Sequence, residues 1–76
     1  MKEQIIKIIS DLVPDFENDE ESKLLDDGIL DSFDIVSLVM ELNEEFDVDI
    51  NVMDITEDNF NTVDTICELV RTKLDE

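Results

Sequence analysis

The chain has 76 residues, of which 23 are acidic and five are basic, so its formal net charge is −18. This length suffices for one small domain, and the charge argues against nucleic acid and anionic membranes as partners, because binding to phosphate depends on Lys and Arg. With no histidine and one cysteine, the chain cannot build a Ser-His-Asp or Cys-His catalytic site, a zinc site or an internal disulfide.

The first predicted element is a helix over residues 3–13, whose apolar residues follow the i, i+3, i+4, i+7 spacing and which Pro14 ends. A long connection follows over residues 15–31, and connections of this length are usually functional or disordered. Four apolar residues in its second half are expected to attach it to the core: Leu24, Leu25, Ile29 and Leu30. Gly28, the only glycine, is expected to provide the backbone freedom for the turn before Ser32.

The second predicted helix spans residues 32–46 and has two apolar stripes. At about 100° per residue, one stripe is wide enough to face a core; it contains Ile35, Leu38, Val39, Leu42 and Phe46. The other lies on a different side and consists of Phe33, Val36 and Met40. A surface helix needs only one such stripe, so this helix is either central and buried on both sides or presents the second stripe to a partner or ligand.

The remaining elements complete a helical bundle. An irregular segment over residues 47–55 leads to a brief third helix around residues 54–59. A last helix, capped by Asn61 or Thr62, runs to about Leu74. Its core stripe is Val63, Ile66, Cys67, Val70 and Leu74, so Cys67 is expected to be a buried apolar residue. We predict an all-α fold in one domain over residues 1–76: a four-helix bundle of three long helices and one short helix, with a long first loop.

Calcium is the metal ion that the acidic stretches of the sequence would be most suited to bind. Asp47, Asp49 and Asn51 occupy the first, third and fifth positions of an EF-hand loop, but Val52 stands where that loop needs glycine and Asp58 where it needs a bidentate glutamate. We therefore expect no metal site. An unmodified acidic adaptor or a calcium-responsive module remains the alternative from another functional class.

Ser32 stands where a polar loop turns into the apolar second helix. A serine at this position is most often a helix cap. Asp31 could cap the helix equally well, which would leave the Ser32 hydroxyl free. The amino end of a helix also favours negative charge, so a phosphodiester on Ser32 would be stabilised there.

These residues resemble the acyl carrier protein family. The resemblance rests on Asp31-Ser32-Phe33, on the run from Val36 to Leu42, on Glu44-Glu45-Phe46, and on the order of elements along the whole chain. It implies that Ser32 carries 4'-phosphopantetheine through a phosphodiester and that the thiol of this arm holds acyl or aminoacyl groups as thioesters. It also implies that the protein is not itself an enzyme.

The residues before Ser32 bear on the cargo. Residues 28–32 read Gly-Ile-Leu-Asp-Ser, which is similar to the Gly-Leu-Leu-Asp-Ser of D-alanyl carrier proteins. Those proteins commonly have Pro where Asn51 stands and Met where Phe33 stands. D-alanine is therefore the leading cargo, and fatty-acid, polyketide or other acyl groups are the alternatives.

The resemblance also implies the partners. A phosphopantetheinyl transferase would modify Ser32, with Asp31 helping to position the transferase and coenzyme A. An activating ligase or synthase would load the thiol, and an acyltransferase would unload it. The acidic residues expected to steer these basic partners are Asp34, Glu41, Glu44 and Glu45, and the apolar contact is expected at Phe33, Val36 and Met40. With no targeting or membrane-spanning segment visible, we expect a monomer in the cytoplasm.

Overall fold

A computed structural model describes residues 1–14, 16 and 23–75. The elements are α1 (Lys2–Leu12), α2 (Ser32–Phe46), the 3-10 helix η1 (Val52–Asp54), α3 (Glu57–Phe60) and α4 (Val63–Leu74). The described residues contain no strand. This confirms the predicted all-α fold of three long helices and one short helix, with a long connection between α1 and α2.

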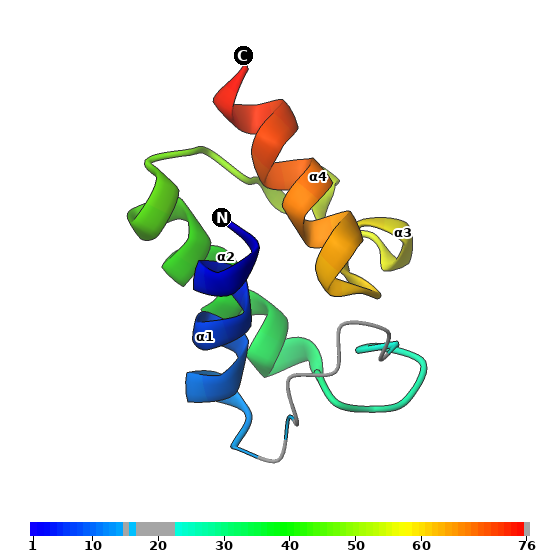
Figure 1. Ribbon diagram of the computed structural model, residues 1–76. Coiled ribbons are helices and arrows are strands. Elements are labelled where there is room, and N and C mark those ends of the chain that lie inside the picture. Colours follow the sequence, from blue (N-terminus) through cyan, green and yellow to red (C-terminus); the bar gives the residue numbers. More distant parts are fainter. Residues whose placement is uncertain (15, 17–22, 76) are drawn as a thin grey trace.

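The three long helices pack on one another around a single core. α1 lies against α2 and also contacts α4, while α3 packs beside the start of α4 (Figure 1). Residues 23–31, the described part that leads into α2, lie at the end of the bundle where α2 begins (Figure 1). The site at the start of α2 therefore lies between these residues and the body of the bundle.

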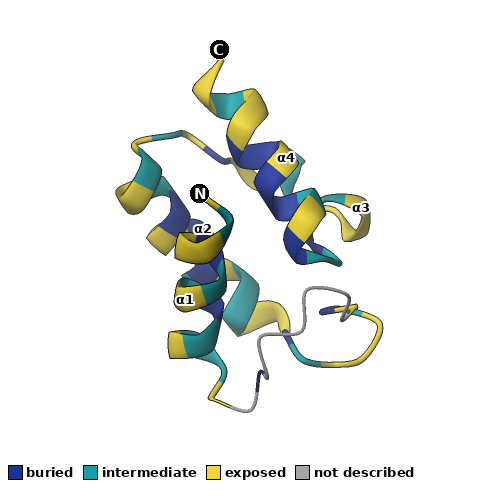
Figure 2. Ribbon diagram, viewed as in Figure 1, coloured by how far each residue is buried: buried dark blue, intermediate teal, exposed yellow. Residues whose placement is uncertain are grey.

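All four helices contribute buried apolar residues to the core, as do the α1–α2 connection and the segment between α2 and η1. Figure 2 shows the buried residues along the ribbon. The long connection supplies Phe16, Leu24 and Leu30, of which Leu24 is fully buried and Leu30 is 4% exposed. Leu25 and Ile29 are partly buried and pack against the same core. The prediction that these residues attach the second half of the connection to the core is confirmed.

The helix boundaries follow the signals in the sequence. α2 occupies residues 32–46 as predicted, and Asp47 ends it in the left-handed conformation, with φ 52°. α1 begins and ends one residue earlier than predicted. Val13 is already extended (φ −128°, ψ 91°), because the ring of Pro14 disfavours the helical conformation of the preceding residue.

The third helix differs from the prediction. The predicted single helix around residues 54–59 is instead two short elements, η1 and α3, separated by Ile55 and Thr56. Thr56 is extended (φ −125°, ψ 160°), and its side-chain oxygen accepts a hydrogen bond of 3.2 Å from the Asn59 backbone N–H. A threonine that caps a new helix stops the previous one, so no continuous helix passes through this point.

The last helix begins at one of the two predicted caps, but its core stripe needs two corrections. Its amino-terminal cap is Thr62, which accepts a 3.1 Å hydrogen bond from the Thr65 N–H. Leu69, which lies outside the predicted stripe, is only 8% exposed, whereas Leu74 is 47% exposed. α4 contacts three other helices, so it buries a wider face than one stripe, and its final residue lies beyond them. Cys67 is buried and free, as predicted, and burial raises the pKa of its thiol.

An ion pair ties the end of α4 to η1 and predicts a pH dependence of stability. Lys73 Nζ lies 2.7 Å from Asp54 Oδ2, with the two side chains 10% and 21% exposed. The hydrogen bond from Lys73, together with that from the Asn51 backbone, lowers the pKa of Asp54 below its ordinary value of 3.8. A carboxyl whose pKa is depressed by folding stabilises the fold at pH values above 3.8, and this contribution is lost as the pH falls from there through the folded-state pKa.

We therefore expect Lys73→Met to lower the urea midpoint of unfolding at neutral pH. The difference in urea midpoint between this variant and the native chain should shrink as the pH falls below 3.8. Arg71→Met is the matched control, because Arg71 pairs with Glu68 in an exposed i, i+3 contact and such pairs contribute little. A difference for Lys73→Met that stays constant down to acidic pH would show that the ion pair with Asp54 does not cause it.

Candidate functional site

Ser32 is the first residue of α2, and it is not the cap. The cap is Asp31, whose Oδ1 accepts a 2.9 Å hydrogen bond from the Asp34 N–H, while the Asp31 N–H donates to Asp34 Oδ2 at 3.3 Å. Ser32 is exposed, and its hydroxyl has no hydrogen-bond partner among residues 1–14, 16 and 23–75. Of the two interpretations of this serine, the structure supports the one in which its hydroxyl is available for chemistry.

The turn before Ser32 is built from local and core contacts. Gly28 has a φ of +72°, a conformation that a residue with a side chain rarely adopts, so its predicted role in the turn is confirmed. The Leu30 N–H donates to the Leu24 carbonyl oxygen at 2.9 Å, and both side chains are buried. The chain therefore enters α2 from a point fixed in the core only two residues before Ser32.

The start of α2 suits a phosphodiester attached to Ser32. The amino end of a helix has a partial positive charge, and the N–H groups of its first residues lack partners within the helix. Asp34 N–H is already bound by Asp31 and Ile35 N–H by the Asp31 carbonyl, which leaves the amides of Ser32 and Phe33 to face an added anion. The exposed hydroxyl gives a phosphate group room to bind. The residues present thus fit the group that the sequence resemblance implies.

The second apolar stripe of α2 is exposed. Phe33 is 84% exposed, Val36 54% and Met40 63%, whereas Leu38 and Leu42 on the core side are fully buried. The alternative in which α2 is covered on both sides is therefore wrong. The three residues, called the apolar stripe from here on, begin directly beside Ser32 and run along α2 for two turns.

Two further exposed apolar residues were not singled out from the sequence. Val52 and Met53 of η1 are 81% and 86% exposed. In the sequence, Val52 stood out only as a misfit in a calcium loop. A short segment without a clear helical or strand period gives no face on which to place such residues, so no sequence signal marked them.

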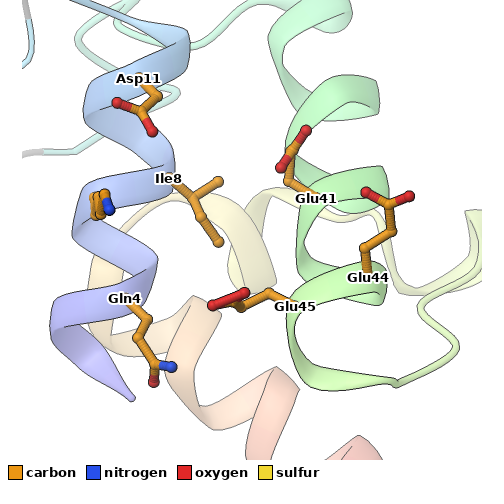
Figure 3. A pocket seen from close by; sticks show the side chains of 7 residues that line it. Gln4, Ile8, Asp11, Glu41, Glu44 and Glu45 are labelled. Carbon is orange, nitrogen blue, oxygen red and sulfur yellow. The ribbon is translucent and has the colours of Figure 1, made fainter.

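The acidic residues of α2 divide into two groups. Glu41, Glu44 and Glu45 are exposed and line a pocket of about 380 Å³ between α1 and α2, together with Gln4, Lys7, Ile8 and Asp11 (Figure 3). Asp34 is half-buried and belongs to the capping box instead. On α2 the predicted acidic surface is therefore concentrated in three glutamates, and α1 adds both a positive and a negative side chain, Lys7 and Asp11, to the same pocket.

Two general features bear on the kind of site. In the part of the chain that the structure describes, no three His, Cys, Asp or Glu side chains are placed to hold a metal ion. None of the described helices combines the length and the apolar character needed to cross a membrane.

Comparison with known proteins adds independent observations. The family model described as "Phosphopantetheine attachment site" matches residues 3–70. The D-alanyl carrier protein of Lactococcus lactis subsp. cremoris (strain MG1363) is 35% identical over 78 residues, which cover 100% of this chain and 99% of that protein. The D-alanyl carrier protein of Streptococcus mutans is 35% identical over 69 residues, which cover 90% of this chain and 87% of that protein. That of Lactobacillus delbrueckii subsp. bulgaricus (strain ATCC BAA-365 / Lb-18) is 30% identical over 77 residues, covering 100% and 96%.

Proposed function

This chain belongs to the family of carrier proteins with a phosphopantetheine attachment site, and from this premise we propose that Ser32 is the residue that bears the 4'-phosphopantetheine. The observation that carries the proposal is the exposed hydroxyl of Ser32 at the start of α2, which makes no hydrogen bond within the part of the chain that the structure describes. Asp31 supports it, because its carboxylate takes over the capping that a serine would otherwise provide.

The attached arm supplies a flexible tether and a terminal thiol that holds cargo as a thioester. Ser32 Oγ forms a bond to the phosphorus next to the pantetheine arm of coenzyme A, the pyrophosphate bond of coenzyme A breaks, and adenosine 3',5'-bisphosphate leaves. The proton of the Ser32 hydroxyl passes to a base of the transferase. The first turn of α2 holds the hydroxyl at the edge of the bundle and places its free amides beside the new phosphodiester. Asp31 keeps the helix start rigid and presents its charge to the side of the transferase that binds coenzyme A.

The surface around Ser32 is proposed to dock the partner enzymes. The apolar stripe supplies the contact area, since it is exposed and adjoins Ser32. Glu41, Glu44 and Glu45 form a charged border that steers basic partners, and Asp34 adds its charge to the same field. The partners are the transferase, an activating ligase or synthase that loads the thiol, and an acyltransferase that unloads it. Tethering raises the effective concentration of the cargo in each of their active sites.

We propose D-alanine as the cargo. The support is the identity with D-alanyl carrier proteins over nearly their whole length, together with the Gly-Ile-Leu-Asp-Ser sequence of residues 28–32. Asn51, where those proteins commonly have Pro, caps η1 through a 2.9 Å hydrogen bond from the Met53 N–H. The departure therefore has a local structural role in capping η1.

The cargo can be tested with the phosphopantetheine-bearing protein and the D-alanine-activating ligase of its own host. With ATP and D-alanine, we expect a mass gain of one alanyl group that hydroxylamine removes, because hydroxylamine cleaves thioesters. L-alanine and octanoate in parallel reactions should give much less product, and the apo protein should give none. Loading of octanoate but not of D-alanine by the host's extract would assign the chain to acyl carriers of the fatty-acid or polyketide type.

Four further features belong to the same proposal. The family is generally non-catalytic, and we propose that this chain is a substrate of the transferase and catalyses no step itself. Residues 1–76 act as one carrier domain, as a monomer, in the cytoplasm. The single core to which all four helices contribute supports the one-domain assignment.

A further inference from the structure

We propose that Asn61 is a positioning residue for the modification of Ser32, holding in place the turn that leads into α2. Asn61 is half-buried at the junction between α3 and α4, far from Ser32 in the sequence. The inference rests on the proposed function of Ser32, and it assigns to the α3–α4 junction a part in presenting the hydroxyl.

Four hydrogen bonds join Asn61 to the turn. Its backbone carbonyl oxygen accepts a hydrogen bond from the Leu24 N–H at 2.5 Å. Its side-chain Oδ1 accepts from the N–H groups of Leu25 and Asp26 at 3.1 and 3.2 Å, and its Nδ2 donates to Asp26 Oδ2 at 3.2 Å. Both halves of the amide are used, so an asparagine is well matched to this position.

The turn transmits this position to Ser32. The Leu24 carbonyl oxygen, on the residue held by Asn61, accepts from the Leu30 N–H at 2.9 Å, and Leu30 stands two residues before Ser32. The anchor itself is fixed, because the neighbouring Phe60 and Val63 are fully buried in the core. A continuous set of hydrogen bonds therefore runs from the α3–α4 junction to the residue that precedes the cap of α2.

The charges around the turn show what Asn61 opposes. Asp26 lies beside Glu57 of α3, and this neighbour raises the pKa of the Glu57 carboxyl. The hydrogen bond from Asn61 is the main cause that lowers the pKa of Asp26, with Glu57 and Lys23 contributing less. Two carboxylates side by side repel each other when both are charged, and the hydrogen bond that Asn61 Nδ2 donates to Asp26 Oδ2 holds the turn against this repulsion. Loss of the amide would let this end of the turn move away from α3.

The test compares Asn61→Ala with a matched variant in steady-state modification by coenzyme A and a phosphopantetheinyl transferase. Asn43→Ala is the control: Asn43 Oδ1 accepts from the Ile50 N–H at 2.8 Å and its Nδ2 donates to the Ile50 carbonyl at 3.3 Å, at the opposite end of α2. Both variants lose side-chain bonds to the backbone, but only Asn61→Ala removes bonds to the turn before Ser32, at Leu25 and Asp26, while the backbone bond to Leu24 remains. Circular dichroism establishes that each is folded at the assay temperature, and Asn61→Ser replaces Asn61→Ala if the alanine variant does not fold.

The expected result is a kcat about tenfold lower for Asn61→Ala than for the native chain, because small displacements of a reacting group cost rates of this order or more. The KM for the carrier should change little, since the apolar stripe is untouched, and Asn43→Ala should keep the native kcat. A merely structural role would leave kcat unchanged and raise the apparent KM, because only the folded fraction would be a substrate.

The proposal is overturned if Asn61→Ala keeps the native kcat while the amide chemical shifts of Leu25 and Asp26 show that their hydrogen bonds to Asn61 are lost. If the native chain itself is not modified, the failure lies with the assignment of Ser32 and not with Asn61.

Discussion

Ser32→Ala is expected to abolish the attachment of phosphopantetheine completely. The reason is chemical: the phosphodiester needs the oxygen of Ser32, and alanine removes that oxygen while keeping a residue that suits the first turn of a helix. Because the Ser32 hydroxyl makes no hydrogen bond in the described part of the chain, its loss should leave the stability of the fold almost unchanged. Intact mass after incubation with coenzyme A and a phosphopantetheinyl transferase measures the attachment directly.

Ser37→Ala is the matched control, since Ser37 lies in the same helix but is half-buried. This variant should gain the mass of one phosphopantetheine, as the native chain does. A mass gain on Ser32→Ala would place the modification on another side chain. A melting temperature for Ser32→Ala far below that of the native chain would show that the hydroxyl has a structural role after all.

Met40→Glu is expected to weaken turnover by the partner enzymes while leaving the fold intact. Met40 is 63% exposed at the end of the apolar stripe away from Ser32, so a glutamate there stays solvated in the free protein. In a docked complex the same carboxylate would be buried in apolar surroundings. A residue that carries much of the binding energy of an interface is worth about 2 kcal/mol or more, so kcat/KM for loading by the ligase should fall by roughly 30-fold.

Leu38→Glu provides the contrast from the core side of the same helix. Leu38 is fully buried. Burying an unpaired carboxylate costs several kcal/mol. This is a large part of the total stability of such domains, which is about 0.05–0.15 kcal/mol per residue. This variant should lose its cooperative melting transition. If Met40→Glu unfolded in the same way, Met40 would belong to the core and the apolar stripe would have no docking role. A folded Met40→Glu that is loaded at the native rate would likewise exclude the stripe from the interface with the ligase.

The elements with strong local signals could be predicted from the sequence. α2 begins and ends at the predicted residues because Asp31 caps it and its apolar residues keep a helical period over its full length. The turn at Gly28 could also be predicted from the sequence, since a lone glycine before a helix marks a special backbone conformation. The sequence predicts one helix in place of η1 and α3, because both elements are shorter than the stretch over which a helical period can be recognised. Only the cap at Thr56 separates them.

The site was predicted less completely, because part of it depends on contacts between distant segments. The helical period showed that α2 has two apolar stripes, but not which neighbours cover them. That Phe33 stays exposed follows from the path of the other elements in three dimensions. The bonds of Asn61 to Leu25 and Asp26 span more than 30 positions of the chain, and no local pattern announces them. For the same reason the sequence left open whether Asn61 or Thr62 caps α4.

The account depends above all on Ser32 Oγ being the point at which the arm is joined to the chain. Fragment-ion mass spectrometry of the native chain, after incubation with coenzyme A and a phosphopantetheinyl transferase, tests this most directly. We expect one phosphopantetheine per chain, with the added mass on every fragment that contains Ser32 and on no other. An unmodified chain under conditions that modify a known carrier protein, or an added mass that maps to a different residue, would contradict it.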